Sequence, residues 1–149
     1  MKIQRYSCVL KKSGVLHVAD GCSPIHTVDH ALIAARKELA DSPSERILCF
    51  HTDGANNLIG FEQVSQGGLH GAAVMPREIL RGAIIANASA IILAHNHPSG
   101  DPTPSVEDIN MTKSIASACK VVGLSFLDHI IITRSSRYSS LTAMGHIEI

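Results

Sequence analysis

Residues 90–108 constrain the fold of this 149-residue chain more than any other stretch. They begin with an apolar run, Ala-Ile-Ile-Leu-Ala at 90–94, whose short length and β-branched content predict a buried strand. Residues 98–104 are dense in proline, glycine and other turn formers, so the chain must bend before any regular element resumes. A helix is then expected over about 105–122, with Gly123 at its C-cap. A strand and a helix joined in this way indicate an α/β fold.

The same stretch carries three side chains that can share one metal ion. His95 and His97 lie two positions apart, so in a strand they point to the same face of the sheet. Asp108 follows in the first turn of the expected helix. Two imidazoles and one carboxylate leave the fourth position of a tetrahedral zinc open, which is typical of a catalytic site. A simpler interpretation is a helix N-terminus with Ser105 as N-cap, and the two interpretations are compatible.

The rest of the chain has the periodicity of a mixed sheet with helices packed against it. A cluster of turn formers over 53–57 separates two strand-like segments, which predicts an antiparallel hairpin. The expected elements are one or two strands within 1–20 with a turn at Ser13-Gly14, a helix over about 23–41, strands over 45–50 and 58–64, a helix over 76–87, strands over 124–126 and 129–133, and a polar loop over 134–140 before a last short strand.

Composition limits the class of protein to which the chain can belong. With 45% hydrophobic and 17% charged residues, the chain has enough apolar side chains for one domain with its own core. The formal net charge is zero, whereas a domain that binds duplex DNA normally has a basic face. No apolar run approaches the length of a membrane span, and the first residues lack the apolar segment of a secretory leader. The cysteines form no Cys-x-x-Cys pair, so we expect reduced thiols and a cytoplasmic location: Cys8, Cys22, Cys49 and Cys119.

The spacing His95-x-His97-Pro98, six residues, then Ser105-x-x-Asp108 resembles the JAMM motif of the JAB/MPN metallopeptidase family. The sequence around it is similar to the RadC-like branch of that family, most densely over 45–145. The similar segments are Met-Pro-Arg-Glu at 75–78, Ala-His-Asn-His-Pro-Ser-Gly-Asp-Pro at 94–102 and Leu-Asp-His-Ile-Ile at 127–131.

Two departures from the RadC-like pattern are visible. Met75 stands where RadC-like chains often have histidine, and Gly67-Gly68 replaces a usual Gly-Thr. Neither change touches a ligand of the motif, so the chemistry that the resemblance implies is unaffected.

The resemblance implies a single JAB/MPN domain over 1–149, with the cytidine-deaminase-like mixed sheet flanked by helices. It also implies a hydrolase with one zinc ion (Zn²⁺) per chain, held by His95, His97 and Asp108, that cleaves peptide or isopeptide bonds. The expected partner is a peptide or protein substrate of unknown identity. Strong nucleic-acid binding and membrane association are not expected.

Hydrolysis at such a site needs a carboxylate that takes a proton from the attacking water. The sequence offers four glutamates, and spacing does not choose among them: Glu45, Glu62, Glu78 and Glu107. The resemblance implies Glu45, which stands 50 residues before His95, with Glu62 as the second choice. It also implies that Ser105 donates a hydrogen bond to the oxyanion of the tetrahedral intermediate, beside its role as N-cap.

We also consider two functions other than hydrolysis. RadC-like proteins carry a DNA-repair label, and their longer members resemble this chain only in a C-terminal part that follows a helix-hairpin-helix module. We expect no such module in 149 residues, and the zero net charge argues against strong direct DNA binding. The second alternative is a non-catalytic MPN scaffold, against which stands the presence of all the motif's ligands.

Histidines outside the motif are weaker candidates for a site. His26 and His30 share a helix face at i, i+4, but no third ligand is placed to join them, so we expect no metal there. His129 precedes an apolar run. It is either a hydrogen-bonded core residue, which we favour, or part of the cleft wall near the metal.

Overall fold

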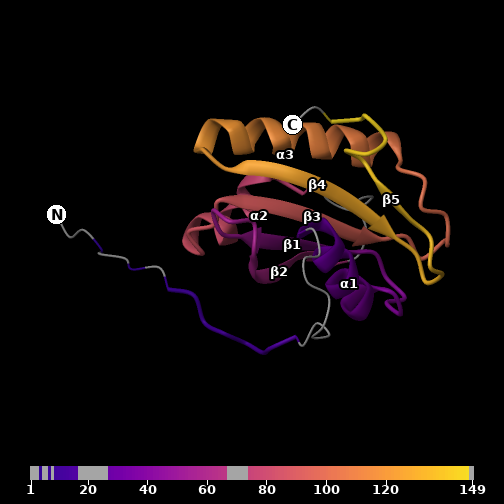
Figure 1. The fold of residues 1–149 in the computed structure, drawn as a ribbon, viewed down its shortest axis with the longest axis horizontal. Helices are drawn as coiled ribbons and strands as arrows, with labels where there is room; N and C mark the ends of the chain where they lie inside the picture. Colours follow the sequence, from indigo (N-terminus) through magenta and orange to yellow (C-terminus); the bar gives the residue numbers. More distant parts are fainter. Residues whose placement is uncertain (1–3, 5–6, 8, 17–26, 67–73, 148–149) are drawn as a thin grey trace.

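The structure is a computed structural model that describes residues 4, 7, 9–16, 27–66 and 74–147. Within these residues a five-stranded mixed sheet and three helices form a single α/β domain, which confirms the expected fold class (Figure 1). The elements are α1 (Thr27–Leu39), β1 (Arg46–Thr52), β2 (Leu58–Gln66), α2 (Pro76–Ile85), β3 (Ala90–Asn96), α3 (Val106–Val122), β4 (Ser125–Ile132) and β5 (Tyr138–Ser140).

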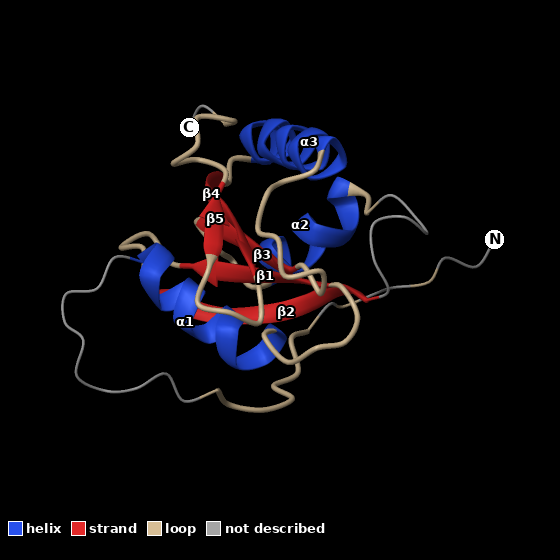
Figure 2. Cartoon of the chain, turned by 90° about the vertical axis from the view of Figure 1, so that its right-hand side faces the viewer, coloured by secondary structure: helices blue, strands red, loops and turns tan. Residues whose placement is uncertain are grey.

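The strands lie in the order β2-β1-β3-β4-β5. The pair β3–β4 is parallel and the other three neighbouring pairs are antiparallel. A parallel pair needs a crossover connection, and α3 supplies it between β3 and β4. Figure 2 shows α2 and α3 on one face of the sheet and α1 on the other, so the domain has three layers.

The alternation of side chains along β3 divides the core between the two faces. Ile91 and Leu93 pack in the cluster that α2 and α3 cover, whereas Ile92 and Ala94 pack in the cluster that α1 covers. All seven residues of β3 are buried, as expected for a central strand. By the same alternation His95 faces α3, at the end of the strand where the chain turns.

The expected strands at the N-terminus are wrong for the residues that the structure describes there. Residues 9–16 form neither helix nor strand, and Ser13-Gly14 connects no pair of strands. Val9 and Val15 are 83% and 79% exposed, so the local apolar pattern gains no burial that would favour a strand. The helix expected from 23 is described from Thr27, and its earlier residues lie outside the described part.

The last third of the chain also departs from expectation. Instead of two short segments, β4 is one strand that runs through Asp128, because a bulge takes up the extra residue: Ile91 pairs with Phe126 and Ile92 with Asp128. The segment 134–140, expected to be a loop, contains β5, and residues 141–147 form turns rather than a last strand.

Candidate metal centre

The end of β3 and the turn that follows place the two motif histidines. The backbone N–H of His97 donates to the carbonyl of Ile132 on β4 (2.9 Å), so His97 is held beside the sheet although β3 has ended. The turn closes with a hydrogen bond from Gly100 N–H to the His97 carbonyl, and Gly100 has a φ of 85° that favours glycine. The Arg137 side chain donates to the Gly100 carbonyl (2.6 Å), which ties this turn to the loop before β5.

The N-terminus of α3 places the carboxylate. Ser105 is the N-cap, as expected, and its hydroxyl accepts a hydrogen bond from the Asp108 N–H (3.1 Å). In return Asp108 Oδ2 accepts from the Ser105 N–H (2.8 Å) and from the Ser105 hydroxyl (2.6 Å). This reciprocal cap leaves the carboxylate little freedom to turn away from β3.

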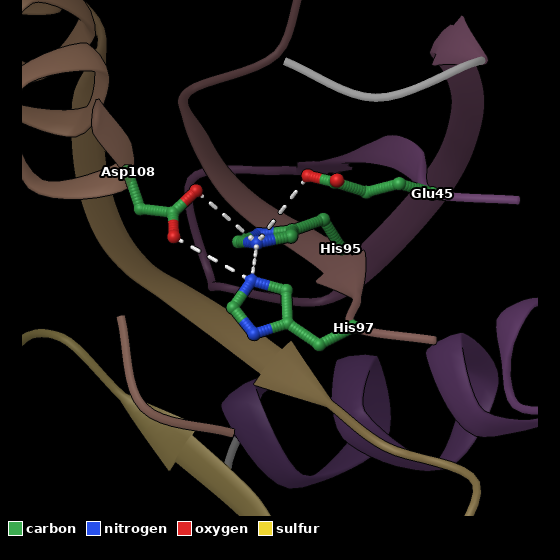
Figure 3. Close-up of side chains that lie close together, drawn as sticks. All are labelled: Glu45, His95, His97 and Asp108. Carbon is green, nitrogen blue, oxygen red and sulfur yellow. Dashed lines mark hydrogen bonds and ion pairs between the residues drawn. The ribbon is translucent and has the colours of Figure 1, made fainter. Parts of the chain in front are cut away.

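Four predicted residues come together in one cluster, and Figure 3 shows His95 between Asp108 and Glu45 with His97 beside it. His95 Nε2 lies 3.3 Å from Asp108 Oδ1 and 4.0 Å from Glu45 Oε1, and His97 Nε2 lies 3.5 Å from Asp108 Oδ2. The two Nε2 atoms are 2.8 Å apart. One ligand atom from each residue lies within 4.8 Å of the others, so the cluster could hold a metal ion.

The electrostatics of Asp108 support a cation at this point. Burial raises the pKa of Asp108, but the close contacts with the imidazoles of His95 and His97 and the hydrogen bond from the Ser105 hydroxyl outweigh burial and hold the pKa well below its usual range. The carboxylate is therefore ionised, with a side-chain exposure of 1%. Its Oδ1 is buried and accepts no hydrogen bond from any described residue, although it faces the cluster. A buried charged oxygen without a donor is costly, and a metal ion is the partner that fits.

Glu45 lies just before β1, and Asn96 holds the backbone on both sides of it. The Asn96 side-chain oxygen accepts from the Arg46 N–H (2.9 Å), and its amide donates to the carbonyls of Ser44 (3.1 Å) and Ser42 (3.4 Å). Asn96 is 2% exposed, so these bonds are shielded from water. The residue between the two histidines thus positions the segment that carries the fourth member of the cluster.

A third histidine, His129, lies behind the cluster, and the sequence indicated its role only in part. His129 is fully buried, as favoured, but it also contacts the site: its Nε2 is 2.7 Å from His95 Nδ1. Its Nδ1 is 2.6 Å from the hydroxyl of Thr112, which the sequence analysis did not single out. Burial holds the pKa of His129 well below its usual range, so its ring is neutral.

His97 has a different second contact. Its Nδ1 is 2.7 Å from the Asp101 carbonyl, which can only accept, so Nδ1 carries the proton that it donates. The hydrogen bond to Asp108 raises the pKa of His97 in spite of partial burial. His97 Nε2 therefore points at the cluster while the ring is anchored by the turn.

The other glutamates do not join the cluster. Glu62 Oε1 lies 3.7 Å from His51 Nε2, and both atoms are buried without a hydrogen bond from the described residues. Glu78 accepts from the Met75 N–H (3.2 Å) at the start of α2, and Glu107 is exposed on α3. Of the four glutamates that spacing left open, only Glu45 lies within reach of His95 and His97.

Two further expectations fall partly outside the described residues. Cys49 and Cys119 are free and buried, and burial raises the pKa of Cys49 far above its usual range and that of Cys119 to about 11, so these two thiols are protonated. Cys8 and Cys22 lie outside the described residues, as does His26 of the His26–His30 pair.

No helix within the described ranges is both long and apolar enough to cross a membrane.

Comparison with known proteins identifies the family. The family model of the RadC-like JAB domain matches residues 25–146, so this chain belongs to the RadC-like JAB family. A UPF0758 protein from Syntrophomonas wolfei is 42% identical over 113 residues, which cover 76% of this chain and 48% of the relative. The UPF0758 protein SPO0054 from Ruegeria pomeroyi is 44% identical over 115 residues, covering 77% and 51%. The chain thus spans about half the length of these relatives, whose names state no activity.

Proposed function

We propose that this chain is a zinc-dependent hydrolase of the JAMM type that cleaves peptide or isopeptide bonds. The observation that supports it most is the cluster of two imidazoles and one buried carboxylate, with a second carboxylate, Glu45, at its edge. In this proposal His95, His97 and Asp108 are the ligands of one zinc ion per chain. Two histidines and a carboxylate leave a coordination position open, which distinguishes a catalytic from a structural zinc site.

The spacing of the three ligands fits such an ion. Zinc–nitrogen distances of about 2.0–2.1 Å place the ligand atoms of a tetrahedral site about 3.3 Å apart. The two Nε2 atoms are 2.8 Å apart, His95 Nε2 lies 3.3 Å from Asp108 Oδ1, and His97 Nε2 lies 3.5 Å from the other oxygen, Oδ2, so small side-chain shifts suffice to bind zinc. Zinc in such a site acts as a Lewis acid that polarises a carbonyl and makes water a stronger acid.

Glu45 is the proposed proton acceptor. Its side chain is 18% exposed, whereas that of Asp108 is 1% exposed, so Glu45 lies where the cluster meets solvent. Glu45 Oε1 lies 4.0 Å from His95 Nε2, too far for a direct hydrogen bond, so the carboxylate remains available to a water molecule at the cluster. Glu45 would take a proton from that water during attack and give it to the departing amine.

Ser105 is the proposed donor to the developing oxyanion. In the structure its hydroxyl donates to Asp108 Oδ2, so the hydroxyl must rotate away from Asp108 to reach a substrate oxygen. The backbone N–H of Ser105 keeps its own hydrogen bond to Asp108, which would hold the carboxylate in place meanwhile. The N-cap and the oxyanion donor are therefore compatible roles.

Two probes test this proposal, a defined peptide library and a peptide with Gly-Gly on a lysine Nε. Zinc-loaded protein should cleave at least one of them, with loss of activity under a chelator and recovery on addition of zinc. Asp108→Asn is the matched control, because it removes the ligand charge at nearly constant volume. Cleavage that persists equally with chelator and in Asp108→Asn, or no cleavage of either probe by zinc-loaded protein, would contradict the proposal.

A further inference from the structure

We propose that Thr112 and His129 are positioning residues that fix the tautomer of His95, so that its Nε2 presents a lone pair to the metal. The inference deepens the proposed zinc site and rests on it. It concerns residues outside the JAMM spacing, and it follows from the direction of three consecutive hydrogen bonds.

The three bonds form an unbranched chain behind the metal cluster. The Thr112 hydroxyl lies 2.5 Å from the Asp108 carbonyl and 2.6 Å from His129 Nδ1. His129 Nε2 lies 2.7 Å from His95 Nδ1. All four residues are 0% exposed, so solvent water is not an alternative partner for these groups.

Thr112 sets which group donates and which accepts along this series of hydrogen bonds. A carbonyl only accepts, so the single hydroxyl proton of Thr112 goes to the Asp108 carbonyl. The hydroxyl oxygen must then accept from His129, which places a proton on His129 Nδ1. The ring is fully buried between a hydroxyl and another imidazole and makes no ion pair with a carboxylate of the described residues, so His129 is neutral and its Nε2 carries no proton.

The same logic then determines His95. Since the bare Nε2 of His129 can only accept, His95 Nδ1 must carry the proton that it donates. A neutral His95 protonated at Nδ1 has its lone pair on Nε2, the atom 3.3 Å from Asp108 Oδ1. Many zinc-binding histidines obtain this orientation from a carboxylate. Here a neutral histidine supplies it, and the only negative charge on the ligand set is that of Asp108.

The fold explains why these residues meet. Thr112 lies one helical turn after Asp108 on α3, so the helix that carries the carboxylate ligand also carries the first residue of the hydrogen-bond series. On the parallel pair β3–β4, His129 is in register with Leu93, two residues before His95 on the same face. The crossover helix and the strand that follows it thus converge behind one ligand.

Thr112→Val tests the chain, with Thr112→Ser as the matched control. Valine keeps the shape of threonine but removes the hydroxyl, so nothing directs the His129 proton to Nδ1, and His95 is free to adopt either tautomer. The dissociation constant for zinc, measured by competition with a chromophoric chelator, should rise about 10–100-fold in Thr112→Val. Thr112→Ser should remain close to wild type, which a purely steric role of Thr112 would not predict.

A spectroscopic readout tests the tautomer without metal. In ¹⁵N-labelled, chelator-treated wild-type protein, long-range ¹⁵N–¹H correlation spectra should show His95 protonated at Nδ1, and Thr112→Val should lose that preference. A wild-type His95 protonated at Nε2, or a zinc affinity unchanged in folded Thr112→Val, would overturn the inference. If wild type binds no zinc, the proposed function fails while the spectrum still decides the tautomer. If Thr112→Val does not fold, the wild-type spectrum decides alone.

Discussion

Asp108 Oδ1 lies 3.3 Å from His95 Nε2 and accepts no hydrogen bond from the described residues, although the side chain is almost fully buried. The other oxygen, Oδ2, accepts two hydrogen bonds from Ser105. The capping motif of α3 therefore satisfies one side of the carboxylate and aims the other at an imidazole from β3. The N-terminus of α3 thus forms one wall of the candidate metal centre.

Acid should weaken the fold of chelator-treated protein through Asp108. The groups that face its carboxylate are His95 and His97, with Glu45 at the edge of the cluster. Since the pKa of Asp108 is lower in the folded protein than its ordinary value of 3.8, its charge stabilises the fold above pH 3.8, and this stabilisation is lost progressively as the pH falls below 3.8. Urea unfolding of wild type and Asp108→Asn should differ by about 1.5–3 kcal/mol at pH 7. That difference should shrink below pH 4, and a difference independent of pH would contradict the assignment.

Replacing Asn96 should impair catalysis without removing metal. Asn96→Ala deletes the hydrogen bonds to Arg46 and Ser44 on either side of Glu45, so the proposed general base loses its fixed position while the proposed ligands keep theirs. We expect kcat to fall with zinc stoichiometry unchanged. Ile130→Val, a core change on the α1 face, is the control for a general loss of stability of about 0.5–1.5 kcal/mol. Equal losses of kcat in both variants would argue against a positioning role.

Glu45→Gln should abolish hydrolysis and retain both zinc and fold. The amide is nearly isosteric but cannot take a proton, and loss of a general base costs about 10²–10⁴ in rate. Glu62→Gln is the matched control, since Glu62 lies beside His51 and outside the cluster. An inactive Glu62→Gln with an active Glu45→Gln would leave the metal site intact and show that the base is wrongly assigned.

Duplex DNA should bind negligibly at physiological salt. The chain has a net charge of zero, and in the loop 134–137 Arg134 pairs with Asp41 while Arg137 donates to the Gly100 carbonyl. A domain in which acidic residues balance the basic ones is expected to release few counterions from phosphate. A gel-shift or anisotropy titration that gave submicromolar affinity with a steep salt dependence would contradict this expectation.

The meeting of His95, His97 and Asp108 could be predicted from the sequence, because the position of each side chain has a local cause. Strand alternation aligns His95 with His97, and the serine cap fixes Asp108 in the first turn of α3. Glu45 has no such local signal. Its approach depends on the pairing of β1 with β3, in which Ile47 faces His95, and a resemblance rather than spacing indicated it.

Features that depend on distant partners escaped prediction. Thr112 and His129 meet only because α3 crosses between parallel strands, and no spacing encodes that contact. The bulge that keeps β4 continuous is likewise set by its partner strand. At the N-terminus an apolar pattern suggested strands, but Val9 and Val15 find no sheet to cover and remain exposed.

Zinc binding by wild type and ligand variants tests the central claim most directly. Calorimetric titration should give about one zinc per chain for wild type and for Glu45→Gln, because a catalytic site needs three protein ligands and Glu45 is not among them. His95→Ala, His97→Ala and Asp108→Ala should each remain folded by circular dichroism and lose that binding. Unchanged zinc stoichiometry and affinity in all three variants would contradict the account.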